Sequence, residues 1–98
     1  MEKEIKEAII GTVGSLIFDT YKVENNEVTA VFTIFGEKNT LKFTVDETEM
    51  IISISAIEWD IERTIEVYPG MDVDCEVNTT VNSIISECFE STMEHYLY

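Results

Sequence analysis

The chain has 98 residues, with 20 acidic side chains against six basic ones and a net charge of −14 at pH 7. Hydrophobic residues make up 45% of it, which is enough for a core and excludes an acidic disordered tail. The length predicts a single domain spanning residues 1–98, and the charge argues against direct binding to DNA or to an anionic membrane.

The first predicted element is a helix over residues 2–17. Its apolar residues recur at spacings of three and four, and its early glutamates suit the positive end of a helix dipole. Gly11 and Gly14 lie inside this segment and weaken it, and glycines at such places often mark close contact with another backbone. We therefore expect a first helix that packs closely against a neighbour.

The middle of the chain predicts an antiparallel meander of strands. Ile and Val together number 22 against three Leu, a bias that favours strands over helical bundles. Asn25-Asn26 is a plausible two-residue hairpin turn, and residues 36–39 form the next predicted turn. The strands expected on either side of these turns are Phe18–Glu24, Glu27–Phe35, Thr40–Asp46 and Met50–Ala56.

Residues 57–68 alternate most clearly between apolar and polar side chains. One face would carry Ile57, Trp59, Ile61, Arg63, Ile65 and Val67, and the other Glu58, Asp60, Glu62, Thr64, Glu66 and Tyr68. Helical spacing fits part of the segment, so a bend or helical turn near residues 56–61 stays open. After a turn at Pro69-Gly70, alternation over residues 72–77 predicts a last short strand.

The last predicted element is a helix over Val81–Tyr96, capped by Asn78 or Thr79. Its stripe pattern buries Ile84, Ile85, Cys88 and Phe89 and exposes Glu87, Glu90 and Glu94 on the opposite side. The order of elements predicts an α+β fold, an antiparallel β-meander of four to six strands flanked by an N-terminal and a C-terminal helix packed on one face.

Acidic residues in the second half of the chain form the candidate interaction site. If Pro69-Gly70-Met71 is a three-residue loop, Glu66 pairs with Asp74, and like charges oppose each other across two strands. A carboxylate ladder of this kind suits a cationic partner, and the alternative is an acidic surface that only keeps the protein soluble. The predicted partner-binding residues are Glu58, Asp60, Glu62, Glu66, Tyr68, Asp72, Asp74 and Glu76.

In its small size and acidic surface the chain resembles phage anti-restriction and anti-CRISPR proteins that imitate DNA, without matching any motif. The resemblance implies a non-enzymatic inhibitor, in the host cell cytoplasm, that occludes the basic nucleic-acid-binding groove of a partner protein. The alternative is a small accessory or chaperone-like module that forms homodimers and binds its partner through apolar surface. Its order of elements is similar to that of type III secretion chaperones.

Enzymatic and metal chemistry find little support in the sequence. Cys88 and His95 are two helical turns apart, about 10.5 Å along the axis, which is too far for proton transfer. Asp72, Asp74 and Glu76 resemble the start of a calcium loop, but the glycine that should follow is missing. We expect no catalytic residue, no cofactor and at most weak divalent-metal binding.

Targeting signals are also missing from the sequence. The apolar run Ala8–Phe18 is shorter than the roughly 20 residues that a bilayer requires, and the charges before it do not suit a secretory signal. We therefore expect an intracellular protein with two reduced cysteines.

Overall fold

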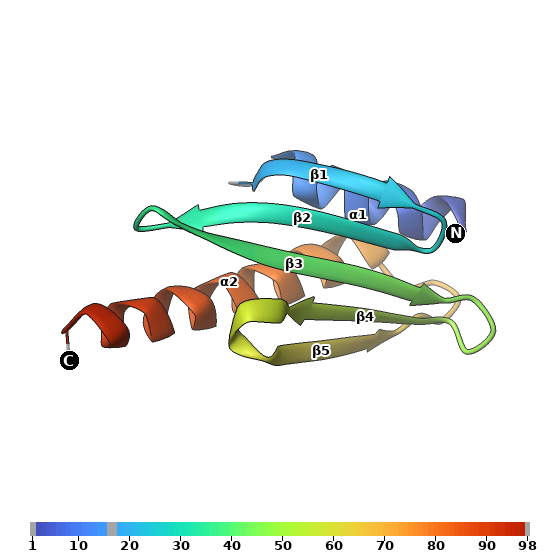
Figure 1. The fold of residues 1–98 in the computed structure, drawn as a ribbon. Coiled ribbons are helices and arrows are strands. Elements are labelled where there is room, and N and C mark those ends of the chain that lie inside the picture. Colours follow the sequence, from blue (N-terminus) through green and yellow to red (C-terminus); the bar gives the residue numbers. More distant parts are fainter. Residues whose placement is uncertain (1, 16–17, 98) are drawn as a thin grey trace.

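The computed structural model describes residues 2–15 and 18–97, and Figure 1 shows an antiparallel sheet with both helices on one of its faces. Helix α1 (Lys3–Ser15) comes before the sheet and helix α2 (Val73–Leu97) after it. The strands are β1 (Phe18–Glu24), β2 (Glu27–Ile34), β3 (Glu37–Asp46), β4 (Ile51–Ala56) and β5 (Ile61–Glu66). They form a meander in the order β1-β2-β3-β4-β5, which confirms the predicted α+β fold class.

The turns of the meander contain residues with positive φ. Asn25 (φ 46°) lies in the β1–β2 turn, as predicted. Phe35 (φ 49°) and Gly36 (φ 79°) together make the β2–β3 turn, and positive φ at both central residues is the pattern of a type I′ hairpin. The turn predicted over residues 36–39 is therefore wrong, because the ladder already pairs Glu37 with Ile34.

The segment before β5 combines both patterns seen in the sequence. A short 3-10 turn, η1 (Ile57–Trp59), follows β4, and Asp60 ends it in the left-handed conformation with φ 54°. β5 then starts at Ile61, so the alternation over residues 57–68 becomes a strand only in its second part. The helical turn that the sequence left open near residues 56–61 is present.

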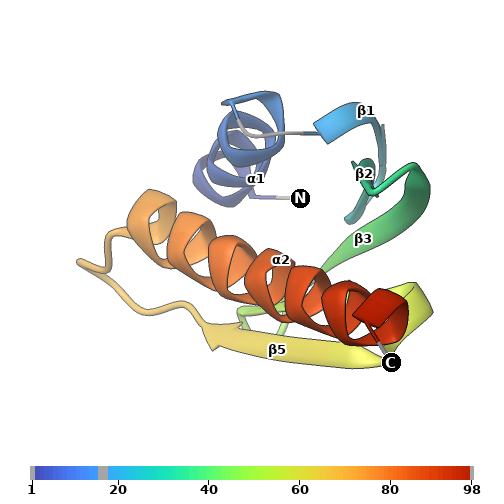
Figure 2. The same ribbon diagram turned by 90° about the vertical axis from the view of Figure 1, so that its left-hand side faces the viewer.

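The core lies between the inner face of the sheet and the two helices. Alternate residues of β2, β3 and β4 point inward and are buried, as their spacing predicts. Figure 2 shows α1 beside β1 and α2 running over β5. The largest fully buried side chains are Phe32, Phe43, Ile5, Ile9, Leu41, Ile52, Ile54 and Ile84.

One expectation about α1 is not met, and another lies outside the described residues. Gly11 and Gly14 are exposed, and a Cβ at either position would meet nothing within 4 Å, so close backbone packing is not the reason for these glycines. The helix ends at Ser15, and residues 16–17 of the predicted helix lie outside the described residues.

The largest correction concerns residues 72–77, which were predicted to form a strand and instead begin α2. Asp72 caps the helix, because its Oδ1 accepts a hydrogen bond from the backbone N–H of Cys75 at 3.1 Å. Val73 and Val77 are both buried and four residues apart, and the same spacing leads on to Val81. The alternation of valine and acid was therefore also a helical pattern of period four.

The remainder of α2 agrees in part with its predicted faces. Ile84 and Cys88 are buried, and Ile85 is partly buried against the core. Phe89 is 46% exposed, and its ring lies 5.5 Å from that of Phe35 in the β2–β3 turn. Glu90 and Glu94 are exposed as predicted, Glu87 is half-buried, and the side chain of Tyr96 lies outside the described residues.

The two cysteines are free thiols in different surroundings. Cys75 is exposed and Cys88 is fully buried. Burial raises the pKa of the Cys88 thiol from its ordinary value of 9.0 to about 11, and the negative charges of Glu87 and Glu58 add to the effect. In the part of the chain that the structure describes, neither helix has an apolar stretch long enough to cross a membrane.

Stability should therefore fall in alkaline solution partly through Cys88. Because its pKa is higher in the folded state, the neutral thiol contributes its full stabilisation below pH 9, and that contribution is lost as the pH rises towards 11. Urea unfolding at pH 8 and pH 10.5 should show a larger loss in the wild type than in Cys88→Ala. Cys75→Ala is the matched control and should lose as much as the wild type, whereas an equal loss in all three proteins would contradict the assignment to Cys88.

An acidic groove between β5 and α2

The predicted partner-binding residues divide into two groups at opposite ends of β5. Glu58, Asp60 and Glu62 lie at its start, on η1 and the first residues of the strand, and the other five lie at or beyond its end. The predicted carboxylate ladder does not form, because Glu66 pairs with Ile51 of β4 and Asp74 is helical. Six strand residues span about 17 Å between the first and the last.

The group at the end of β5 has a structural role at the start of α2. Asp72 is the cap, and Asp74 and Glu76 lie in the first turn, where negative charge stabilises a helix. Tyr68 is 63% exposed in the loop before them. On the predicted strand, Asp72, Asp74 and Glu76 would have shared one face. Alternate residues of a helix point to different sides, so these three carboxylates do not lie on one face of α2. No three His, Cys, Asp or Glu side chains among the described residues are placed to hold a metal ion.

In the group at the start of β5, Asp60 and Glu62 lie beside the second half of α2, whereas the Glu58 carboxylate accepts a hydrogen bond from the backbone N–H of Thr40 on β3 at 2.6 Å. Helix α2 runs back along β5 over the inner face of the sheet (Figures 1 and 2), and a groove of about 610 Å³ lies between them. We call this the acidic groove. It is lined by Asp60, Ile61, Glu62, Arg63, Glu87, Glu90, Ser91 and Glu94.

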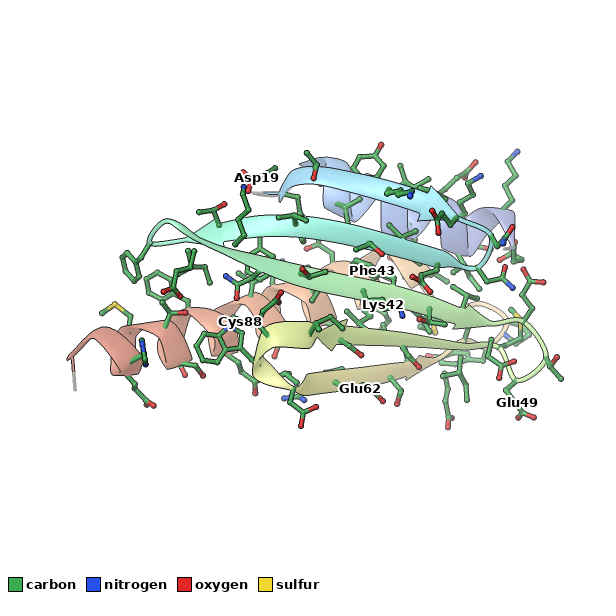
Figure 3. The ribbon with its side chains drawn as sticks, viewed as in Figure 1. Asp19, Lys42, Phe43, Glu49, Glu62 and Cys88 are labelled. Carbon is green, nitrogen blue, oxygen red and sulfur yellow. The ribbon has the colours of Figure 1, made fainter. Side chains whose placement is uncertain are left out.

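Charge in the acidic groove is strongly one-sided. The Glu62 side chain lies on the other face of the sheet, so four carboxylates and one guanidinium remain among the lining residues, giving a net charge of −3. Glu87, Glu90 and Glu94 share one flank of α2 because they are spaced three, four and seven residues apart. Asp60 lines the groove from the left-handed turn that ends η1. Glu62 lines it from β5 (Figure 3), but its side chain lies on the outer face of the sheet, where its Oε2 accepts a hydrogen bond from Ser55 Oγ at 3.2 Å. The surrounding segment 57–97 holds ten acids and one base, a net charge of −9.

Arg63 is the one base among the residues that line the acidic groove, and both terminal nitrogens of its guanidinium already donate hydrogen bonds. One guanidinium nitrogen donates to both oxygens of Glu87, at 2.7 and 2.8 Å, and the other donates to the backbone carbonyl of Glu62 at 2.9 Å. Both bonds to Glu87 come from the same nitrogen, so this contact differs from the fork in which two guanidinium nitrogens each donate to one carboxylate oxygen. Glu90 and Glu94 are exposed a turn or two further along the same flank of α2.

The outer face of the sheet differs from the acidic groove. It carries three of the six basic residues, Lys22, Lys38 and Lys42, among threonines and serines. Lys22 forms an ion pair with Glu24 at 2.6 Å, and Lys42 pairs with Glu27 at 3.5 Å. The hydrogen bond and the opposite charge raise the pKa of Lys22 and lower that of Glu24. The outer face thus mixes these lysines with acids, including Glu62 and Glu66 of β5, whereas Arg63 is the one base among the residues that line the acidic groove.

Sequence reasoning found part of this site. It included Asp60 and Glu62, but it assigned Glu87, Glu90 and Glu94 to a separate surface. The signal that could have joined them is the shared stripe on α2 together with the short link after β5, which returns the helix along that strand. A comparison of the chain with protein-family models, curated proteins and solved structures finds no match. The geometry of the acidic groove therefore carries the functional argument.

Proposed function

We propose that the protein is a non-enzymatic binding protein whose acidic groove docks a basic surface of a partner protein. The observation that carries the proposal is the gathering of four carboxylates, one from the turn before β5 and three from α2, around one hollow in which the single base is already paired. Lysine and arginine side chains are the groups that complement such a surface.

The proposed consequence of binding is inhibition. Protein surfaces rich in lysine and arginine are typical of nucleic-acid-binding sites, where they contact phosphates. A protein that occupies such a site excludes the nucleic acid, which is the competitive occlusion that the resemblance to DNA-mimicking phage proteins implies. The net charge of −14 would also accelerate association by long-range attraction.

The test compares two variants that lose equal charge at different places. The groove variant carries Asp60→Asn, Glu90→Gln and Glu94→Gln, and the matched control carries Glu4→Gln, Glu7→Gln and Glu49→Gln. With each protein immobilised as bait in a cell lysate at low salt, the wild type and the control should retain a nucleic-acid-binding protein that the groove variant loses. An added DNA duplex should release that protein from the wild type.

Two outcomes would count against the proposal. Equal loss in both variants would mean that net charge alone causes binding. Capture that survives in the groove variant but disappears in Phe35→Asn would favour the second candidate, a dimeric or chaperone-like module. That candidate rests on Phe35, which is 55% exposed in a left-handed conformation and packs on the exposed ring of Phe89.

A further inference from the structure

The acidic groove runs beside an open edge of the sheet. β5 is the last strand in the order β1-β2-β3-β4-β5, and within the described residues no strand pairs with its other side. An edge strand presents a row of backbone N–H and C=O groups to which an extended chain can bind. The edge therefore offers a second kind of contact, independent of the carboxylates.

The register identifies the backbone groups on that edge. The N–H of Val67 donates to the carbonyl of Met50, which makes these residues a hydrogen-bonded pair at the end of the β4–β5 ladder. Such pairs alternate along an antiparallel ladder, so residues 61, 63 and 65 direct their backbone groups towards β4. Glu62, Thr64 and Glu66 direct theirs towards the free edge, and all three residues are exposed.

The contacts of Arg63 show that a guanidinium group binds at this edge of β5. Its guanidinium reaches across the edge to the backbone carbonyl of Glu62 and to the carboxylate of Glu87 on α2. A backbone acceptor on the edge and a carboxylate on the helix thus already hold one arginine side chain. The same side chain partly occupies the space that an incoming basic chain would need.

We infer that an extended, arginine-containing segment of the partner adds to β5 as a sixth antiparallel strand, with alternate arginines directed at Glu87, Glu90 and Glu94. In this arrangement Arg63 is an internal competitor for the same carboxylates. The inference rests on the proposed function of the acidic groove and specifies how the partner binds there.

The spacing of the two elements suits this arrangement. Residues of an added strand opposite 61, 63 and 65 would point to the α2 side, and alternate residues lie about 6.8 Å apart. Glu87 and Glu94 are seven residues apart on α2, about 10.5 Å along its axis, so two successive alternate arginines fit between them. A second copy of this chain is a poor occupant, because pairing β5 with β5 would oppose like charges.

The test uses a blocked octapeptide of four Thr-Arg repeats and two N-methylated forms, with binding measured by fluorescence polarisation in 50 mM salt. In the inferred register the threonine N–H groups bond to β5, and the arginine N–H groups point away from it. N-methylation of the threonines should weaken binding about tenfold or more, since several hydrogen bonds are lost. N-methylation of the arginines should leave the affinity nearly unchanged.

A second arm tests the competitor role of Arg63. Arg63→Gln frees Glu87 and the Glu62 carbonyl, and should raise the affinity for the unmodified peptide about fivefold. Lys42→Gln is the matched control, because it also removes a base that is paired with a glutamate but lies on the outer face of the sheet. It should change the affinity by less than about twofold. Circular dichroism would verify that both variants are folded.

The outcomes separate the inference from the proposed function. If the two methylated peptides bind equally well, or if methylating the arginines is the more damaging change, the strand addition is wrong. If Arg63→Gln binds no better than Lys42→Gln, the competitor role is wrong. If the groove variant binds the unmodified peptide as tightly as the wild type does, the proposed function itself fails.

Discussion

Phe43→Ala should lower the free energy of unfolding by about 3–5 kcal/mol, which is a large part of the roughly 5–15 kcal/mol typical of a small domain. Phe43 lies on β3, the middle strand of the meander, and its side chain is fully buried between the sheet and the helices (Figure 3). Truncation removes the ring and leaves a cavity that neighbours on rigid strands fill poorly. Urea denaturation followed by circular dichroism would measure the loss.

Thr44→Ala is the matched control for this prediction. Thr44 is the next residue of β3, but its side chain points to the uncovered face of the sheet and is exposed. It should change stability by less than about 0.5 kcal/mol. A comparable loss in both variants would contradict the two-layer arrangement, in which only one face of the sheet is covered.

The strands were predictable because their cause is local. In β2, β3 and β4 every second residue is apolar, and burial follows that alternation from Val28 through Phe43 to Ile54. The Asn25-Asn26 turn was predictable for a similar reason, since Asn tolerates positive φ. By contrast, the β2–β3 turn was misplaced because Phe35 is a residue that seldom adopts positive φ.

The start of α2 was not predictable from alternation alone. Val73, Cys75 and Val77 fit a strand, whereas Val73, Val77 and Val81 fit a helix equally well. The structure decides for the helix because Asp72 satisfies a free N–H of the first turn, and because the valines at spacing four reach the core. Cys75, the residue that distinguishes the two patterns, is exposed.

The candidate site depended on tertiary structure that no local pattern contains. Each half was visible in the sequence, with Asp60 in one segment and Glu87, Glu90 and Glu94 as one helix face. Their convergence depends on where the chain crosses after β5 and on which flank of α2 then lies beside that strand. The expected ladder between Glu66 and Asp74 failed for the same reason, because a helix replaced its second strand.

The acids on α2 have opposite effects on stability at its two ends. Asp74 and Glu76 lie at the positive end of the helix dipole, where they are favourable. Glu90 and Glu94 lie towards the negative end, four residues apart, and line the acidic groove together with Asp60. Like charges at this spacing and at this end of a helix are unfavourable.

Reversing the groove charges with Glu90→Lys and Glu94→Lys should therefore stabilise the protein by about 1–2 kcal/mol and raise Tm by roughly 5–10 °C. The same variant should lose binding to a basic partner or peptide. Asp74→Lys with Glu76→Lys makes an equal charge change on the same helix, and should lower stability by about 1 kcal/mol because it opposes the dipole.

Thermal melts in 10 mM and 500 mM salt would measure both effects, and the stability gained by reversing the charges at Glu90 and Glu94 should shrink at high salt. Equal gains in the two variants would mean that net charge, rather than position, sets the stability. A gain confined to the variant with Glu90→Lys and Glu94→Lys would mean that the fold is more stable without these acids, as expected for side chains whose role is binding.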